Sequence, residues 1–243
     1  GAILGPLLVS AVLYLRGDYR AGFALLLIPA LLALGVLLAA RVIYPRPQDL
    51  EATTPELRTR GFPRVFWLYL SAVALVAAGY ADFPLIAYHF EKTNLLAPAL
   101  IPVFYAVAMG VDALAALLFG RLFDRIGLTT LVIVSILSAF FAPLVFLGNE
   151  SAALVGVALW GVGLGAQESI LRAAVAGMVP ADRRGSAYGL FNTGFGLAWF
   201  AGSALMGGLY DVSLPALVAF AVAAQLSAAP LFYLLGKGRS RIA

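Results

Sequence analysis

The chain alternates between long apolar runs and short polar segments, and this alternation predicts its structure. A helix that crosses a membrane needs about 20 mainly apolar residues, and eight runs approach or exceed that length. They cover approximately residues 1–15, 21–40, 65–90, 97–119, 128–147, 152–178, 187–210 and 215–235. We therefore predict an all-α fold, a polytopic transmembrane helical bundle.

Composition supports lipid as the solvent of this chain. Hydrophobic residues make up 63% of the sequence, charged residues 12%, and the mean hydropathy is +0.97. Soluble domains are about 45–50% apolar and about 25% charged. The absence of cysteine and the single histidine exclude a disulfide framework and most metal clusters, so we expect no metal or cofactor. The net charge of +4 is scattered between apolar runs and forms no basic groove, so nucleic acid is not an expected partner.

One charged stretch, GRLFDRIG, separates two of the apolar runs. We expect it to form a short, hydrated and sharply turned loop, because Gly120 and Gly127 give the backbone freedom. Asp124 would accept hydrogen bonds from the free N–H groups of the next helix, while Arg121 and Arg125 favour the cytoplasmic side. The stretch resembles the signature loop of the major facilitator superfamily, G-x-L-x-D-R-x-G, between the second and third helices of the carboxyl-terminal half.

Two further stretches carry the same resemblance. The first six residues, GAILGP, resemble the G-x-x-x-G-P element in the fifth helix of facilitator antiporters, although a packing patch of small residues would look the same. The segments ESILR (168–172), VP (179–180), RRG (183–185) and AYG (187–189) resemble spans ten and eleven of bacterial facilitators. The resemblance implies spans five to twelve, with one complete six-helix half, two helices of the other half, and a missing amino-terminal transmembrane half.

The domain organisation follows from this assignment. We expect residues 1–44 to hold the last two helices of the amino-terminal half, 45–64 a cytoplasmic linker, 65–236 the carboxyl-terminal six-helix half and 237–243 a cytoplasmic tail. Within the linker, Thr54-Pro55-Glu56 is typical of a helix start.

Basic residues set the predicted orientation, because Lys and Arg concentrate in cytoplasmic loops. Arg16, Arg20 and Lys92 fall on one side of the predicted spans. The other side collects Arg41, Arg46, Arg58, Arg60, Arg64, Arg121, Arg125, Arg183, Arg184, Lys237, Arg239 and Arg241. We therefore place the linker, the signature loop and the carboxyl terminus in the cytoplasm, and the protein in the inner membrane of a bacterium.

Ionisable residues inside apolar runs are candidates for proton coupling, because each is costly to place in a bilayer. Asp112 lies eight residues before Gly120, about 12 Å along a helix, with no basic residue within one turn. It is a candidate proton carrier, and a hydrogen-bonded structural aspartate is an equal alternative. Asp82 and His89 flank a helix break at Pro84 and are candidates for an outer gate. A simple kink with an interfacial histidine is the alternative.

Other polar residues suggest a gate and a cavity. The resemblance implies that Glu168 and Arg172, spaced i, i+4, pair with Asp124 and Arg125 as a cytoplasmic gate; a static structural bridge is the alternative. We expect the rest of the signature loop to belong to this gate. Candidates for lining the cavity, or for simple interhelical hydrogen bonds, are Tyr80, Gln167, Asn192 and Gln225. Gly161-x-x-x-Gly165 and Ser203-x-x-x-Gly207 are patterns that allow close helix packing.

The resemblance implies a secondary active transporter of small molecules that works by alternating access. We expect an antiporter coupled to protons, with efflux favoured over uptake because of the GAILGP element; its partners would be a small-molecule substrate, protons and the lipid bilayer. A non-transporting membrane subunit or scaffold is the alternative. The sequence contains no G-x-S-x-G, no H-E-x-x-H and no phosphate-binding loop, so we do not expect an enzyme.

Overall fold

The computed structural model describes residues 1–44 and 61–239, and every predicted apolar run is helical in it. The first two runs are α1 (Leu4–Arg16) and α2 (Tyr19–Ile43). The remaining elements are α3 (Arg64–Ala78), α4 (Phe83–Lys92), η2 (Pro98–Leu100), α5 (Ile101–Ile126), α6 (Thr129–Ala139), α7 (Phe141–Phe146), α8 (Glu150–Ala166), the π turn η3 (Gln167–Leu171), α9 (Arg172–Ala176), η4 (Ala181–Arg183), α10 (Arg184–Val212) and α11 (Leu214–Arg239). The predicted fold class is confirmed.

Within the described residues, six helical segments are long and apolar enough to cross a membrane. They comprise α2, α3 with α4, η2 with α5, α6 with α7, α8 through α9, and α11. Helix α1 is apolar but shorter. Helix α10 has 29 residues but is not among these six segments. Its many glycines, and polar residues such as Asn192 and Thr193, make it less apolar.

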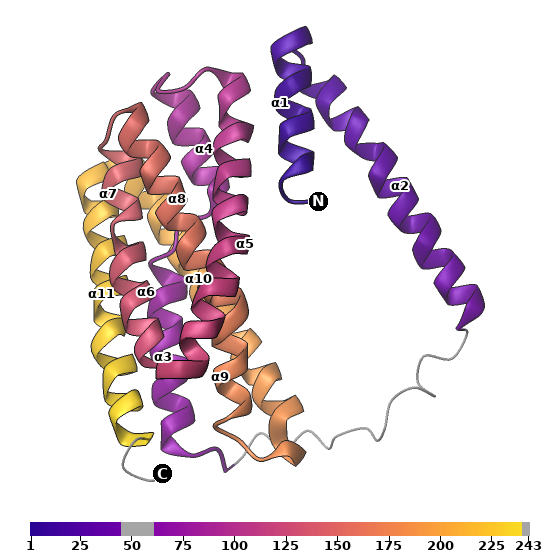
Figure 1. The fold of residues 1–243 in the computed structure, drawn as a ribbon. Coiled ribbons are helices and arrows are strands. Elements are labelled where there is room, and N and C mark those ends of the chain that lie inside the picture. The colour runs from indigo at the N-terminus through magenta and orange to yellow at the C-terminus, as the bar shows by residue number, and fades with distance from the viewer. Residues whose placement is uncertain (45–60, 240–243) are drawn as a thin grey trace.

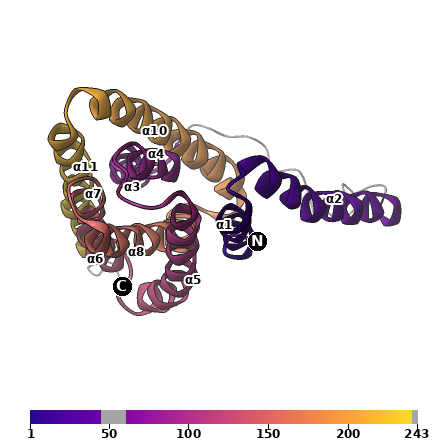
Figure 2. The same cartoon turned by 90° about the horizontal axis from the view of Figure 1, so that it is seen from above.

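Helices α3 to α11 form one bundle, and α1 and α2 lie on one side of it (Figures 1 and 2). Helix α1 packs along η2 and α5, where Ser10 Oγ donates to the carbonyl of Ala99 at 2.7 Å. Helix α2 contacts α1 and then extends away from the bundle, so that Gly22 is its one buried residue. Its exposed side chains are almost all apolar, as expected of a surface that faces lipid or other helices.

The bundle is filled by two clusters of buried side chains. One surrounds Tyr80, Phe90 and Trp160, and the other surrounds Tyr69 and Phe232. The bundle is therefore packed by aromatic side chains along its length.

The predicted helix break before Pro84 is confirmed. Helix α3 ends at Ala78 and α4 begins at Phe83, with four irregular residues between them. The backbone groups freed by the break need partners in a membrane. Trp160 Nε1 donates to the carbonyl of Ala81 at 2.9 Å, and the Tyr80 hydroxyl donates to the carbonyl of Trp160. Helix α8 thus stabilises the interrupted span.

The predicted loop from Gly120 to Gly127 is wrong in its extent. Helix α5 continues to Ile126, and the turn is confined to Gly127, whose φ is 61°, and Leu128. Nor does Asp124 cap the next helix, since α6 begins without a side-chain cap. The residues of this stretch other than glycine are compatible with a helix, so α5 ends only where positive φ is required.

Glycines let two pairs of helices, α5 with α8 and α3 with α10, approach closely. A Cβ atom on Gly161 would lie 2.3 Å from the Ala108 carbonyl oxygen, and one on Gly165 would lie 2.3 Å from that of Asp112. The predicted packing role of Gly161-x-x-x-Gly165, on α8 against α5, is confirmed. The prediction for Gly207 is wrong, because a Cβ there would meet nothing within 4 Å. On α10 the close approach to α3 is at Gly202, where a Cβ would lie 2.1 Å from the Ala78 carbonyl oxygen.

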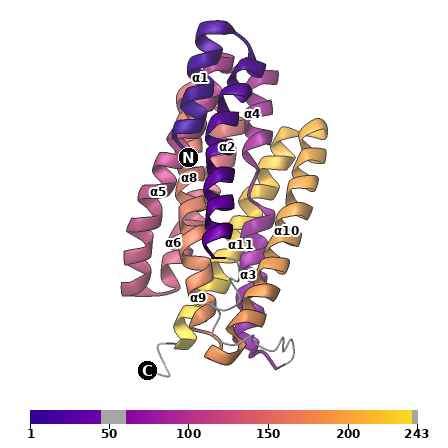
Figure 3. The same cartoon turned by 90° about the vertical axis from the view of Figure 1, so that its right-hand side faces the viewer.

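Connections alternate between the two ends of the bundle, as membrane spans require. The start of α3, the α5–α6 turn, the end of α9 and the end of α11 lie at one end (Figures 1 and 3). The described basic residues at this end are Arg64, Arg121, Arg125, Arg183, Arg184 and Lys237. Most of the predicted linker and the predicted helix start at Thr54 lie outside the described residues, as do the last four residues of the tail.

Candidate functional site

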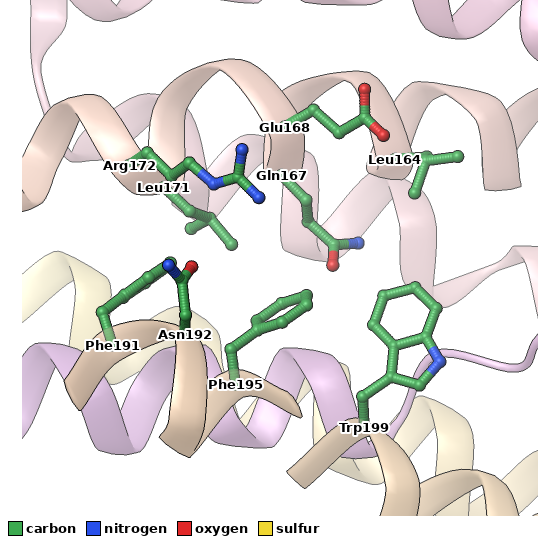
Figure 4. Close-up of a pocket in the computed structure, with 9 residues that line it drawn as sticks. All are labelled: Leu164, Gln167, Glu168, Leu171, Arg172, Phe191, Asn192, Phe195 and Trp199. Atoms are coloured by element: carbon green, nitrogen blue, oxygen red, sulfur yellow. The ribbon is translucent and has the colours of Figure 1, made fainter. Parts of the chain in front are cut away.

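A pocket of about 310 Å³ lies between α10 and the segment that runs from the end of α8 through the π turn into α9 (Figure 4). Residues on α8, the π turn and α9 supply one wall, and α10 supplies the other. The lining residues are Leu164, Gln167, Glu168, Leu171, Arg172, Phe191, Asn192, Phe195 and Trp199. Four predicted site residues, Gln167, Glu168, Arg172 and Asn192, therefore line one pocket.

The polar wall is built on an unusual backbone. Residues Gln167–Leu171 form a π turn, in which hydrogen bonds run from i to i+5 and the regular helical spacing is shifted. The Ser169 hydroxyl donates to the carbonyl of Gly165 at 2.7 Å, and the Tyr69 hydroxyl donates to that of Leu171 at 2.7 Å. Turns of this kind occur often at functional sites. The sequence analysis missed it, because no residue pattern marks a π turn.

Gln167 is the buried polar residue of this wall. Its side chain is 7% exposed, and neither its amide nitrogen nor its amide oxygen has a hydrogen-bond partner. A buried polar group left unpaired costs about 1–3 kcal/mol. Figure 4 shows the amide pointing into the space between the two walls. The pocket therefore offers both a donor and an acceptor to an occupant.

The opposite wall is aromatic. Phe191, Phe195 and Trp199 are spaced i, i+4, i+8 on α10. Phe191 and Phe195 are nearly parallel, with ring centroids 6.1 Å apart and an interplanar angle of 18°. Trp199 follows at 5.4 Å from Phe195. The sequence analysis missed this wall, although the aromatic spacing on one helical face was the available signal.

Two predicted cavity residues lie elsewhere, in fully buried positions. Tyr80 packs among Phe141, Trp160 and Trp199 in the core. Gln225 Oε1 accepts a hydrogen bond from the Ser138 hydroxyl at 3.4 Å. Gln225 therefore takes the alternative role of an interhelical hydrogen bond, between α6 and α11.

Asp82 and His89 contact α10 at two different levels, and the structure shows no contact between them. The indole N–H of Trp199 donates to Asp82 Oδ1. Further along α4, His89 Nδ1 lies 3.0 Å from the Tyr210 hydroxyl. Asp82 is thus joined through Trp199 to the pocket wall, whereas His89 belongs to the far end of α10.

Asp112 lies where α5 and α8 touch. Its Oδ1 atom is buried without a hydrogen-bond partner, and a Cβ on Gly165 would lie 3.0 Å from it. Glu168, three residues after Gly165, lines the pocket. Asp112 therefore contacts the segment that carries the polar wall, on its α5 side.

The predicted gate between Glu168, Arg172, Asp124 and Arg125 stays a prediction. In the described part of the chain, the ion pairs are Lys92–Asp211 at 3.5 Å and Arg183–Asp182 at 4.0 Å, and none joins these four residues. Asp124 and Arg125 lie exposed at the end of α5. Glu168 and Arg172 do not pair with each other. Glu168 lies within the π turn and Arg172 follows it, and the i, i+4 spacing of an α-helix does not hold across this turn.

Comparison with known proteins identifies the family. A family model described as Major Facilitator Superfamily matches residues 1–203 and, in a second and overlapping match, residues 83–240. The chain belongs to the Major Facilitator Superfamily. This family is one of membrane transporters and not of enzymes, and the chain is a multi-pass membrane protein.

Among relatives of this facilitator are the proteins "Uncharacterized protein Rv2265" of Mycobacterium tuberculosis and "Uncharacterized protein Mb2288" of Mycobacterium bovis. Each is 38% identical to it over 240 residues, which are 96% of this chain and 59% of the relative. The chain thus spans about three-fifths of the length of these relatives. No solved structure matches it.

Proposed function

We propose that the chain forms part of a proton-coupled secondary transporter that exports small molecules by alternating access. The pocket between α10 and the π turn would be its substrate site. The observation that carries the proposal is the pair of carboxyl groups at this wall, with Glu168 facing the pocket and one carboxylate oxygen of the half-buried Asp112 enclosed without a hydrogen-bond partner. A buried unpaired charge is costly, which favours proton uptake at such a position.

The arrangement provides a route for coupling. When Asp112 is charged, it repels the charge of Glu168; a proton on Asp112 removes that repulsion. A substrate with a cationic group would in turn stabilise Glu168 in its charged form. Because linkage is reciprocal, the proton would change substrate affinity, and the substrate would change proton affinity by the same factor.

The direction and orientation are part of the proposal. Export rests on the GAILGP resemblance, which lies at the start of α1. The basic residues at the end of the bundle that holds the α5–α6 turn support a cytoplasmic position for that end and for the carboxyl terminus. Mycobacterial relatives support a bacterial inner membrane. We assign residues 65–236 to one six-helix half, with 1–44 belonging to the other.

Alternating access can be tested at Asn192, which is exposed at the pocket wall. A single cysteine is introduced as Asn192→Cys in the full-length protein and labelled with membrane-impermeant maleimides, in inverted vesicles and in right-side-out vesicles. It should react in both preparations, and the extent of reaction in each should change with the imposed proton gradient. Ala201→Cys, exposed on the same helix and outside the pocket lining, is the control. Reaction from one side alone under every gradient would refute alternating access.

Proton coupling can be tested at Asp112. The Asp112→Asn variant of the full-length protein should retain substrate exchange without a gradient and lose accumulation driven by a proton gradient, because asparagine carries no exchangeable charge. The control is Glu150→Gln, an exposed carboxylate at the start of α8 and outside the pocket lining, which should keep coupled accumulation. Full proton-driven accumulation in Asp112→Asn would show that Asp112 is structural.

A further inference from the structure

The pocket combines features that together restrict its substrate class. Its α10 wall presents the rings of Phe195 and Trp199, partly exposed and 5.4 Å apart, above the buried ring of Phe191. Ring faces of this kind stack best on another planar ring. The volume of about 310 Å³ is at the lower end of the range of about 300–1,000 Å³ for small-molecule sites, and so favours a compact solute with one or two rings.

The facing wall requires polar groups on that solute. Gln167 is more than nine-tenths buried, and both atoms of its amide group are unpaired. A hydrocarbon ring alone would leave both atoms unsatisfied. A solute that carries a donor and an acceptor next to its ring would pair both.

The charges on this wall decide the charge of the solute. Glu168 and Arg172 both line the pocket, and within the described residues neither has an ion-pair partner. A purely cationic solute would be attracted by Glu168 and repelled by Arg172, and an anionic solute would meet the reverse. A solute with both charges complements both side chains.

We propose that this pocket binds a small aromatic zwitterion. Its ring lies against Phe195 and Trp199, its ammonium group faces Glu168, and its carboxylate faces the Arg172 guanidinium. The Gln167 amide oxygen accepts from the same ammonium group, and the amide nitrogen donates to the carboxylate. The proposal rests on the transport function proposed above and names the substrate class of the same site. Arginine suits the carboxylate end, because its planar fork can donate two parallel hydrogen bonds.

The test uses four probes that share one ring and differ in charge: tryptophan, tryptamine, indole-3-propionate and indole. Binding of each radiolabelled probe is measured by scintillation proximity on the purified full-length protein at pH 7. We expect tryptophan to bind about tenfold or more tightly than the other three, because it alone complements both charged side chains. Equal or tighter binding of tryptamine, indole-3-propionate or uncharged indole would overturn the proposal.

Charge-neutralising variants assign the two ends. Arg172→Gln should lower tryptophan affinity to about that of tryptamine, and Glu168→Gln should lower it to about that of indole-3-propionate. The controls are Glu150→Gln and Arg184→Gln, exposed residues on α8 and α10 that do not line the pocket; both should bind all four probes as the parent protein does. Thermal unfolding of each purified variant establishes that it is folded. Identical losses for all four probes in either pocket variant would contradict the assignment.

The outcome also separates this inference from the transport proposal. If no probe binds while the accessibility of Asn192→Cys still alternates, the substrate class is wrong and the transport proposal stands. If tryptophan binds as expected and accessibility does not alternate, the zwitterion site stands and the transport proposal fails.

Discussion

The contact between α5 and α8 gives a quantitative prediction at Gly165. In Gly165→Ala the new Cβ would lie 2.3 Å from the Asp112 carbonyl oxygen and 2.9 Å from the Ala116 nitrogen. Ordinary contact begins at 3.4 Å, so the two helices must separate by about 1 Å. Overpacking costs about 1–3 kcal/mol, and this site should be near the upper value because both opposing atoms belong to the backbone. The better helix propensity of alanine offsets about 1 kcal/mol, which leaves a net loss of about 2 kcal/mol.

The measurement is unfolding of the purified full-length protein by sodium dodecyl sulfate in mixed micelles, followed by far-ultraviolet circular dichroism. The matched control is Gly110→Ala on α5, where a new Cβ would meet nothing within 4 Å. It should leave the free energy of unfolding unchanged or raise it by up to about 1 kcal/mol. If Gly165→Ala proved as stable as Gly110→Ala, the close approach of α5 and α8 would be refuted.

Two further predictions concern topology and the π turn. Ser151 and Ala181 are exposed at opposite ends of the α8–α9 span. With impermeant maleimide, Ser151→Cys should react only from the outside and Ala181→Cys only from the cytoplasm. Labelling of both from the same side would contradict the proposed orientation. Tyr69→Phe removes the hydroxyl that donates to Leu171, and should lower the free energy of unfolding in the same detergent titration by about 1 kcal/mol. A buried aromatic residue such as Phe66 would not serve as the control. The control is Tyr88→Phe at the exposed Tyr88, which should lower the free energy of unfolding less than Tyr69→Phe does.

The apolar pattern was sufficient to predict the spans, because lipid requires long apolar helices whatever their partners. It also predicted the break before Pro84, where proline removes a donor from the helix, and the close packing at Gly161 and Gly165. The end of α5 was placed too early. Both Gly120 and Gly127 suggested a turn, and only the backbone shows that Gly127 alone adopts positive φ.

Site residues were predicted less completely than spans. Polarity inside a span marked Gln167 and Asn192, and both line the pocket. The partner of a polar residue depends on which helices meet, so polarity alone did not predict that Trp199 would bond to Asp82. The same limit explains Gln225, whose polarity marked it for the cavity although its position on α11 faces Ser138.

The connections of α10 determine where this helix is able to move. The end of α10 opposite the α5–α6 turn passes to α11 through the single residue Ser213, and is further attached to α4 by Tyr210 with His89 and by Asp211 with Lys92. Phe191 and Phe195 of the aromatic wall lie in the other half of the helix, and Trp199 lies near its middle, where it bonds to Asp82. A displacement of α10 is therefore expected to be a rotation about its α11 end, limited at mid-helix by the bond between Trp199 and Asp82. Its amplitude would grow toward the start of the helix, so that the pocket widens beside Phe191 while the contacts of Tyr210 and Asp211 remain intact.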